Sequence, residues 1–394
     1  MSAANKLVPQ LRFPEFQNTE AWEKVTVAEA VKTISPPKKL QTNQYDQAGS
    51  YPVIDQSPHT ICGWTDDEDA VIRKPLPMVV FGDHTCVIKR ADAPFAQGAD
   101  GIKLLVARNG FDTDFLYQLL CSRPLKSESY KRHFTKLKLV ETPKPRIPAE
   151  QRKIADCLGS LDDRIAAEGR KLAELREHKK GLMQQLFPSE GETQPRLRFP
   201  EFQNAGKWGV EPLGRVVQFV KSKIPVGQME IDDYVSTENL LPEYGGIQRA
   251  TKLPPSGSAT HYKPDDILIA NIRPYLKKVW RANKSGGASN DVIVIRSTSK
   301  LSQNFLRHVI ANDKFINFVM KTAKGVKMPR GDIVSIKEYN VYIPSPAEQQ
   351  SIAECLSVLD TLIAAQAEKI EALRLHKRGL MQQLFPSSDT MDQI

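Results

Sequence analysis

The chain of 394 residues contains one 42-residue segment twice. Residues 148–189 align without a gap to residues 346–387, and 27 of the 42 positions are identical. Both copies end in the same nine residues, GLMQQLFPS. A shorter repeat, LRFPEFQN, begins at Leu11 and again at Leu197. Repeats of this length restrict the chain to a fold that uses one structural plan twice.

The two repeats have different offsets, 186 residues for the short one and 198 for the long one. The segment between them is therefore 12 residues longer in the second half. These segments, about 23–146 and 209–344, share little identity. Both show short apolar runs with Gly and Pro turns, then one helical stretch (near Phe115 or Asn304), a basic loop and a last strand. The sequence therefore predicts a protein of two frames and two inserts. The frames are the repeated segments, which are nearly constant, and the inserts are the divergent segments between them, about 23–146 and 209–344.

The long repeat predicts a helix with an apolar stripe. Pro148 and Pro346 suit a first helical turn, and good helix formers follow them. Apolar residues recur at alternating steps of four and three, which is the heptad pattern of a coiled coil. The predicted seam consists of Ile154, Leu158, Leu161, Ile165, Leu172, Leu175, Leu182 and Leu186, and of Ile352, Leu356, Leu359, Ile363, Ile370, Leu373, Leu380 and Leu384. Polar residues interrupt both stripes at matching positions, which are Glu168 and Gln366, then Lys179 and Lys377.

Two helices with one stripe are expected to pair with each other. Packing of each helix on its own domain is the alternative. At about 1.5 Å per residue, each helix would span roughly 55–60 Å and form a strut between the inserts. The sequence does not fix the orientation, although a chain that returns through a whole insert readily pairs its helices antiparallel. Gly181 and Gly379 lie inside the helices at a cost of about 1 kcal/mol relative to Ala, which suggests close packing there.

The composition is that of a globular protein, with 40% hydrophobic and 26% charged residues. No apolar run reaches the roughly 18 residues of a transmembrane helix. The N-terminus MSAANKLVPQ lacks the apolar core of a signal peptide, so we expect a cytoplasmic protein. The five cysteines include no C-x-x-C pair, which favours reduced thiols over disulfides or a zinc site.

The common signatures of nucleic-acid enzymes are absent from the sequence. There is no G-x-x-x-x-G-K-[ST] phosphate loop, no G-x-G-x-x-G turn and no [DNS]-P-P-[YFW] tetrad of the amino-methyltransferases. The only [DE]-x-K match, Glu177 to Lys179, falls within the predicted helix and is interpreted as a solvated face. We therefore expect no catalytic residue and no metal ligand on this chain.

Basic residues are concentrated in three places, against a net charge of +9 for the chain. Residues 123–146 hold eight Lys or Arg and two Glu. The segment IRPYLKKVWRANK, from Ile272, interleaves five cations with aromatic residues, and a third cluster surrounds KTAKGVKMPRGD, from Lys321. Such clusters suit contact with phosphates, with Arg shaped for a guanine edge and Asn for an adenine edge. An ordinary solvated basic face is the alternative for each cluster.

The candidate DNA-binding residues follow from these clusters. His84 is included because the turn Gly82 to Thr85 lies between two strand-like runs and no partnered nucleophile is evident for it. In the first insert the candidates are His84, Arg123, Lys126, Lys131, Arg132 and Lys136. In the second insert they are Asn271, Arg273, Tyr275, Lys277, Lys278, Arg281, Lys324, Lys327 and Arg330.

Taken together, these segments resemble the specificity (S) subunit of type I restriction-modification systems. The resemblance covers nearly the whole chain. It rests on the repeated LRFPEF and GLMQQLFP segments and on two runs, VVFGDHT with PFAQGADGIK and DILIANIRPYLKKVW with GGASNDVIVI.

The resemblance implies an α+β fold with a pseudo-two-fold internal repeat. Two target-recognition domains of mixed α/β fold would be separated by two long helices in an antiparallel coiled coil. The expected boundaries are residues 1–147 and 191–345 for the domains, 148–190 and 346–387 for the helices, and 388–394 for a flexible tail.

The resemblance also implies which functions belong to this chain and which belong to partner subunits. Each domain would recognise half of a bipartite double-stranded DNA target, and the helices would set the separation and dock two methyltransferase (M) subunits, which restriction (R) subunits would join. S-adenosylmethionine, ATP and magnesium would act on those partners, and no cofactor on this chain. Two other hypotheses stay open: a restriction-modification chain with a cryptic catalytic site of its own, and a structural adaptor whose basic faces contact protein.

Overall fold

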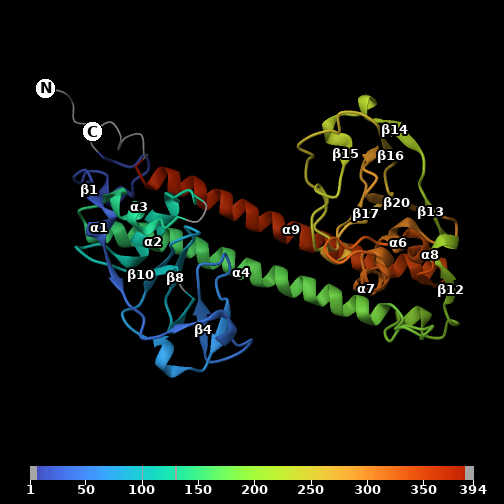
Figure 1. Cartoon of the computed structure of the whole chain (residues 1–394), viewed down its shortest axis with the longest axis horizontal. Helices are drawn as coiled ribbons and strands as arrows, with labels where there is room; N and C mark the ends of the chain where they lie inside the picture. The colour runs from blue at the N-terminus through green and yellow to red at the C-terminus, as the bar shows by residue number, and fades with distance from the viewer. Residues whose placement is uncertain (1–6, 100, 129–130, 387–394) are drawn as a thin grey trace. The chain divides into compact units, whose positions relative to one another are not determined.

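The chain is divided into two compact units in the computed structural model. The residues that the structure describes are 7–99, 101–128 and 131–386. Unit 1 comprises residues 1–170 and 367–394, and unit 2 comprises residues 171–366. Each unit therefore holds one insert and one half of each long repeat (Figure 1). No helix in the described part of the chain is long and apolar enough to cross a membrane, and the tail expected at 388–394 lies outside the described residues.

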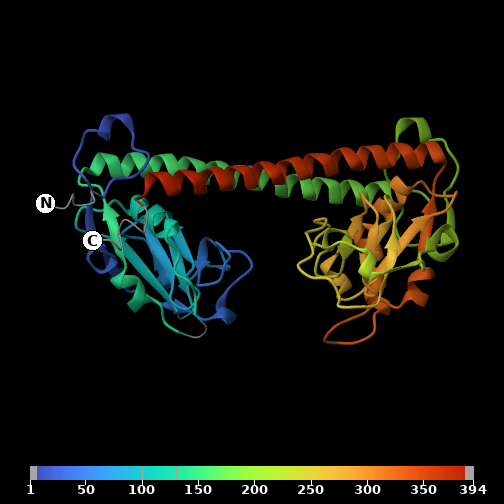
Figure 2. The same ribbon diagram turned by 90° about the horizontal axis from the view of Figure 1, so that it is seen from above.

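The long repeats form the helices α4 (Pro148–Leu186) and α9 (Pro346–Leu384), each of 39 residues. In unit 1 the first half of α4 lies beside the last half of α9, and unit 2 contains the complementary halves (Figure 2). The pairing in unit 1 is antiparallel, because Asp162 contacts Lys377 at 2.5 Å and Glu168 contacts Lys369 at 2.5 Å. In unit 2, Lys179 contacts Asp360 at 2.5 Å.

The heptad residues lie on the inner faces of these helices. All sixteen predicted seam residues are buried or half-buried, whereas their helical neighbours are largely exposed. The polar positions that interrupt the seam also belong to it, because Lys179, Lys377 and Glu168 make the ion pairs just described. The close packing expected at the two helical glycines is wrong, since a Cβ at Gly181 or Gly379 would meet nothing within 4 Å.

The insert of unit 1 contains two main sheets. The first is antiparallel in the order β2 (Val31–Ile34), β10 (Ile102–Ala107), β7 (Met78–Gly82) and β8 (Ile88–Ala91). The second has the order β3 (Lys39–Leu40), β9 (Phe95–Gly98), β4 (Tyr51–Ile54) and β5 (Gly63–Thr65), with β6 (Val71–Ile72) also on β9. The remaining elements are β1 (Glu23–Thr26), which pairs with β11 (Glu141–Lys144), and the helices α1 (Val27–Ala30), α2 (Thr113–Ser122) and α3 (Phe134–Leu139).

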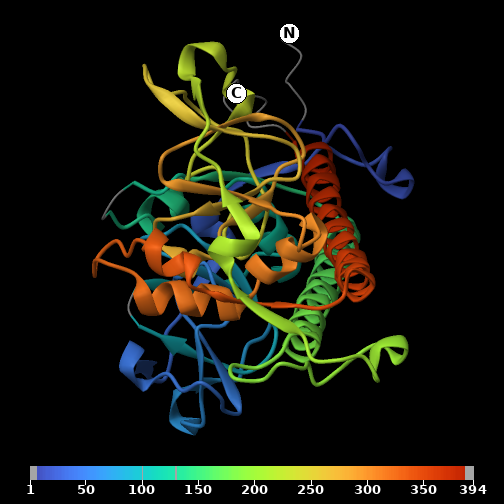
Figure 3. The same cartoon turned by 90° about the vertical axis from the view of Figure 1, so that its right-hand side faces the viewer.

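The insert of unit 2, which faces the viewer in Figure 3, repeats the strand order of the first sheet with different residues. Its first sheet has the order β13 (Val217–Phe219), β20 (Val292–Ser297), β17 (Ile267–Ala270) and β18 (Val279–Arg281). Its second sheet has the order β14 (Lys223–Pro225), β16 (Ser258–Tyr262), β19 (Gly286–Ala288) and β15 (Tyr234–Val235). The remaining elements are β12 (Gly209–Pro212), which pairs with β21 (Asn340–Ile343), and the helices α5 (Leu213–Val216), α6 (Gln303–Ile310), α7 (Asp313–Thr322) and α8 (Ile333–Lys337).

Most of the extra length of the second insert lies in the region that contains α7. A single helical stretch was expected near Asn304, but the structure has two helices, because the side chain of Asn312 accepts a hydrogen bond from the backbone of Lys314 and starts α7 anew. In unit 1, α2 is followed by a loop and then by α3, and no helix takes the place of α7 among the described residues.

One buried ion pair explains why LRFPEF and PAEQ occur twice. In unit 1 the guanidinium of Arg12 donates to both carboxylate oxygens of Glu150 at 2.7 and 2.8 Å, and the indole of Trp22 donates to the same carboxylate at 3.1 Å. The charged side chains are only 6% and 1% exposed. Unit 2 repeats these contacts with Arg198, Glu348 and Trp208. The start of each frame is thereby attached to the first turn of a long helix.

The end of the opposite helix completes each core. The backbone N–H of Leu11 donates to the carbonyl of Gln383, and Phe385 packs against Phe115 of α2 with ring centroids 5.7 Å apart. Leu197, Gln185, Phe187 and Phe305 make the same contacts in unit 2. The GLMQQLF segments are therefore repeated because each closes the hydrophobic core of one unit.

Candidate nucleic-acid interface

The predicted site residues of unit 1 meet where the β7–β8 turn contacts the loop before α3. His133 is 1% exposed and links the two: its Nε2 accepts a hydrogen bond from the backbone N–H of Glu128 at 2.9 Å, and its Nδ1 lies 3.0 Å from the carbonyl oxygen of Asp83. A carboxylate oxygen of Asp83 accepts from the backbone of Phe134 at 2.7 Å. These contacts fix the basic loop beside the turn, and the pattern of charges in the sequence carried no signal for His133 or Asp83.

His84 lies in this turn and is half-buried. Its carbonyl oxygen accepts a hydrogen bond from the hydroxyl of Ser127 at 2.8 Å, which links the turn to the basic loop before α3. Lys126 and Arg132 are exposed on the loop, and neither has an ion pair in the described part of the chain. These three residues belong to the part of the unit 1 surface that is open to a ligand.

Lys131 and Lys136 flank one carboxylate. Their ammonium groups lie 3.1 and 2.7 Å from Glu128, and these hydrogen bonds, with Lys136 contributing most, lower the pKa of Glu128 to about 2. All three side chains are at least 48% exposed. Exposed ion pairs of this kind exchange readily for contacts with a phosphate, because they contribute little net stability.

Arg123 does not belong to this surface. It is half-buried, burial lowers the pKa of its guanidinium, and it donates to the carbonyl of Pro386 just beyond α9. Its hydrogen bond ties the insert to the frame. The expectation that Arg123 contacts DNA is therefore corrected to a structural role.

In unit 2, the β17–β18 turn occupies the place of the β7–β8 turn. Arg273 begins a short 3-10 helix with a left-handed backbone (φ 52°), and its side chain is exposed. Tyr275 in the same turn is 47% exposed. Both side chains are therefore accessible to a ligand, and their contact with DNA stays a prediction.

Three other cations of this turn are already engaged. Lys277 contacts Asp313 at 3.1 Å and Glu243 at 3.3 Å, Lys278 donates to the carbonyl of Thr237 at 2.7 Å, and Arg281 donates twice to Asp265 at 2.6 and 2.9 Å. All three are half-buried. Their charges are satisfied within unit 2, where these contacts support the turn, and the prediction that Lys277, Lys278 and Arg281 contact DNA would require an exchange of these partners.

The third basic cluster lies beside this turn. The backbone N–H of Arg273 donates to the carbonyl of Pro329 at 2.8 Å, and the N–H of Gly331 donates to the carbonyl of Asn271 at 3.0 Å. Lys324, Lys327 and Arg330 are exposed on the loop between α7 and α8. Arg330 also contacts Asp291 at 2.8 Å. The structure thus brings two segments that lie some fifty residues apart in the sequence into one surface.

Asn271 forms the floor of a small cavity at this junction. The cavity, of about 280 Å³, is lined by Asn271, Lys324, Arg330, Gly331, Asp332, Ile333 and Val334. Asn271 is 3% exposed, and within the described residues its side-chain oxygen has no hydrogen-bond partner. Direct contact of this amide with a base edge therefore requires the loop to move, which the sequence did not indicate.

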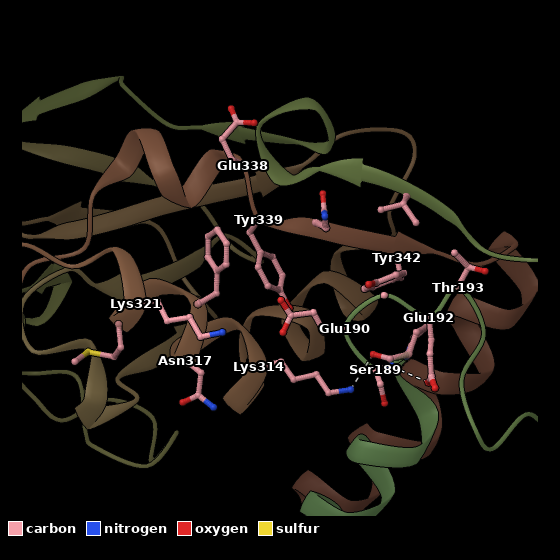
Figure 4. Close-up of a pocket in the computed structure, with 16 residues that line it drawn as sticks. Ser189, Glu190, Glu192, Thr193, Lys314, Asn317, Lys321, Glu338, Tyr339 and Tyr342 are labelled. Carbon is pink, nitrogen blue, oxygen red and sulfur yellow. Dashed lines mark hydrogen bonds between the residues drawn. The ribbon is translucent and has the colours of Figure 1, made fainter.

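A larger pocket of unit 2, of about 950 Å³, lies between the segment after α4 and the helix α7 (Figure 4). Tyr339 and Phe318 form an aromatic wall, with centroids 5.2 Å apart. The ammonium of Lys314 donates to the carbonyls of Phe187 and Pro188 at 3.1 and 2.8 Å. The pocket therefore joins the frame to α7, and Lys321 is the one residue of the basic clusters that lines it. No group of three His, Cys, Asp or Glu suited to a metal ion occurs among the described residues.

Residues 233–375 match the family described as the type I restriction modification DNA specificity domain. The specificity subunit of the type I restriction enzyme MjaVIII from Methanocaldococcus jannaschii is 25% identical over 194 residues, which are 48% of this chain and 43% of that relative. The chain thus matches less than half the length of this relative.

A solved structure has the same fold. The crystal structure of the S subunit of a type I restriction-modification system from M. genitalium superposes with a TM-score of 0.62 at 18% identity, over 97% of this chain and 100% of the other. The predicted fold class, mixed α/β units with long paired helices, is confirmed. Residues 233–375 therefore match the type I restriction modification DNA specificity domain, and the fold of the chain is similar to that of a solved S subunit.

Proposed function

We propose that this chain is the non-catalytic DNA-recognition subunit of a type I restriction-modification complex, with each unit recognising one half of a bipartite target. The observation that carries the proposal is the placement of different side chains on equivalent loops of two equivalent frames. His84, Lys126 and Arg132 occupy these loops in unit 1, and Arg273 and Lys327 occupy them in unit 2. Different side chains on one scaffold favour two half-sites of different sequence.

The frames support a second part of the proposal, which is assembly with partners. Two near-identical frames present related surfaces to two copies of one partner. Two methyltransferase subunits would occupy these surfaces, and restriction subunits would join that core. S-adenosylmethionine, ATP and magnesium would be bound by those partners, which would carry the chemistry.

Methylation mapping tests the proposal directly. The chain would be expressed with its methyltransferase subunits, and the methylated sequences would be compared for the native chain and for Arg132→Ala and Arg273→Ala. We expect Arg132→Ala to relax one half of the target and Arg273→Ala the other, since each arginine is exposed on a different unit. Each variant is the control for the other. Equal weakening on all sequences by both variants would indicate phosphate contacts alone.

Two alternatives give different results. A chain with its own cryptic active site would methylate or cleave DNA when purified away from its partners, so such activity would replace the proposal. An adaptor that contacts protein would leave the DNA affinity of the assembled complex insensitive to salt. A DNA-binding surface with several phosphate contacts instead predicts a steep loss of affinity between about 50 and 200 mM salt.

A further inference from the structure

The loop between α7 and α8 carries apolar side chains that have no cover. Val326 at its tip is fully exposed (102%), and Met328 is 52% exposed. Ile333 and Val334, at the start of α8, are 43% and 71% exposed. Single exposed apolar residues are ordinary, but four within nine positions form a patch that is expected to meet a partner. Figure 2 shows this loop, in deep orange, projecting from the body of unit 2.

Backbone hydrogen bonds hold the base of this loop in place. The backbone groups of Lys324 and Arg330 exchange two hydrogen bonds of 2.9 Å, which close residues 325–329 into a hairpin. Gly325 takes a left-handed backbone (φ 91°) at its bend, and Pro329 is buried. The β17–β18 turn attaches to the same base through Arg273. A tip held in this way loses little conformational entropy when it binds.

The charges around the tip identify the partner. Lys324, Lys327 and Arg330 are spaced three residues apart and alternate with Val326 and Met328. Residues 323–331 contain no acidic residue, and the two carboxylates that contact these cations, Asp332 at 3.4 Å from Lys324 and Asp291 at 2.8 Å from Arg330, lie outside the tip in exposed ion pairs. An apolar tip between cations complements a groove whose walls are phosphates and whose floor is stacked bases.

We propose that Met328 and Val326 form a wedge that enters the DNA groove of the half-site bound by unit 2 and partly unstacks one base step. Lys324 and Lys327 contact the phosphates on either side. Unstacking costs a few kcal/mol per step and costs least at pyrimidine–purine steps, which are the most flexible. The half-site of unit 2 is therefore expected to contain a TA or CA/TG step. This inference rests on the proposed function.

Base unstacking is measured with 2-aminopurine, whose fluorescence rises when it loses its stacking neighbours. The probe would replace single purines along the half-site, in complexes of the full chain with its methyltransferase subunits. We expect a rise at one step and its loss in the double variant Val326→Thr and Met328→Gln, with affinity for the target falling about tenfold. The salt dependence of binding should not change, because the cations remain.

Two controls separate the contributions. Lys327→Gln should reduce the salt slope by about one and keep the fluorescence rise. A rise at an adenine that the methyltransferase flips out should persist in the double variant, which distinguishes flipping from the wedge. An unchanged thermal unfolding midpoint checks the fold, since both replaced side chains are exposed.

The outcomes are distinct. Tight, sequence-specific binding by the native complex with no fluorescence rise in this half-site, or with a rise that the double variant retains, would overturn the wedge and leave the proposed function intact. Absence of sequence-specific binding by the native complex would overturn the proposed function itself.

Discussion

Replacing the buried carboxylate of Glu150 by a neutral amide should lower the free energy of unfolding of unit 1. Glu150 is 1% exposed and receives two hydrogen bonds from Arg12 and one from Trp22. In Glu150→Gln the amide still accepts a hydrogen bond, but Arg12 keeps a buried charge whose remaining acceptors are the neutral carbonyls of Thr19 and Glu20. Breaking a buried pair costs about 3 to 5 kcal/mol, and the retained hydrogen bond favours the lower end, about 3 kcal/mol.

Hydrogen exchange followed by mass spectrometry measures this loss unit by unit. Because about 1.4 kcal/mol corresponds to a factor of ten, exchange of the protected amides in the insert of unit 1 should accelerate by about a hundredfold. Amides in the insert of unit 2 should change little, and Glu348→Gln should produce the reverse pattern. Glu15→Gln is the control, because the contact of Glu15 with Lys153, at 3.3 Å, is exposed. An equally small effect of Glu15→Gln and Glu150→Gln would refute the reasoning that burial gives this ion pair its importance.

Four further predictions concern the helices and the loops. Gly181→Ala or Gly379→Ala should each stabilise the chain by about 0.5 to 1 kcal/mol in thermal unfolding, whereas Gly287→Ala should destabilise it, because the new Cβ would lie 2.2 Å from the sulfur of Met229. The ion pairs of Glu128 should hold above the ordinary carboxylate pKa and be lost as the pH falls through about 2; an NMR titration midpoint near 4.5 would contradict them. His133→Phe should leave the backbone N–H of Glu128 without its acceptor and weaken binding to the half-site of unit 1 alone, as measured by competition between half-site variants. One heptad inserted into both α4 and α9 should lengthen the spacer of the methylated sequence by about three base pairs, from about 1.5 Å per helical residue and 3.4 Å per base pair; an unchanged spacer would mean that the helices do not set it.

The frame could be predicted from the sequence because its contacts recur with the repeats. The heptad positions, the paired helices and the divergent inserts all follow from aligned letters and from the period of the apolar residues. The contact that each repeated residue makes in the folded protein could not be predicted. That Arg12 meets Glu150, 138 residues away, becomes evident only when the chain has folded.

The surface was harder to predict, because a cation in a sequence does not reveal its partner. Lys277 and Lys327 cannot be told apart by charge alone, yet Lys277 is held by Asp313, whereas Lys327 at the loop tip is exposed. Arg123 was misassigned for the same reason, since its acceptor is a backbone carbonyl near the other end of the chain. The exposure of Val326 and Met328 could not be predicted from the sequence either, because apolar residues ordinarily indicate a buried core.

The division of the long helices between the units has a consequence for biosynthesis. A ribosome that has translated residue 366 has supplied every residue of unit 2. Unit 1 at that moment still lacks Leu384 and Phe385, which belong to its hydrophobic core. The part of the protein made first is therefore the last to be completed, and a chain that ends between residues 366 and 384 would hold every residue of unit 2 but would lack part of the core of unit 1.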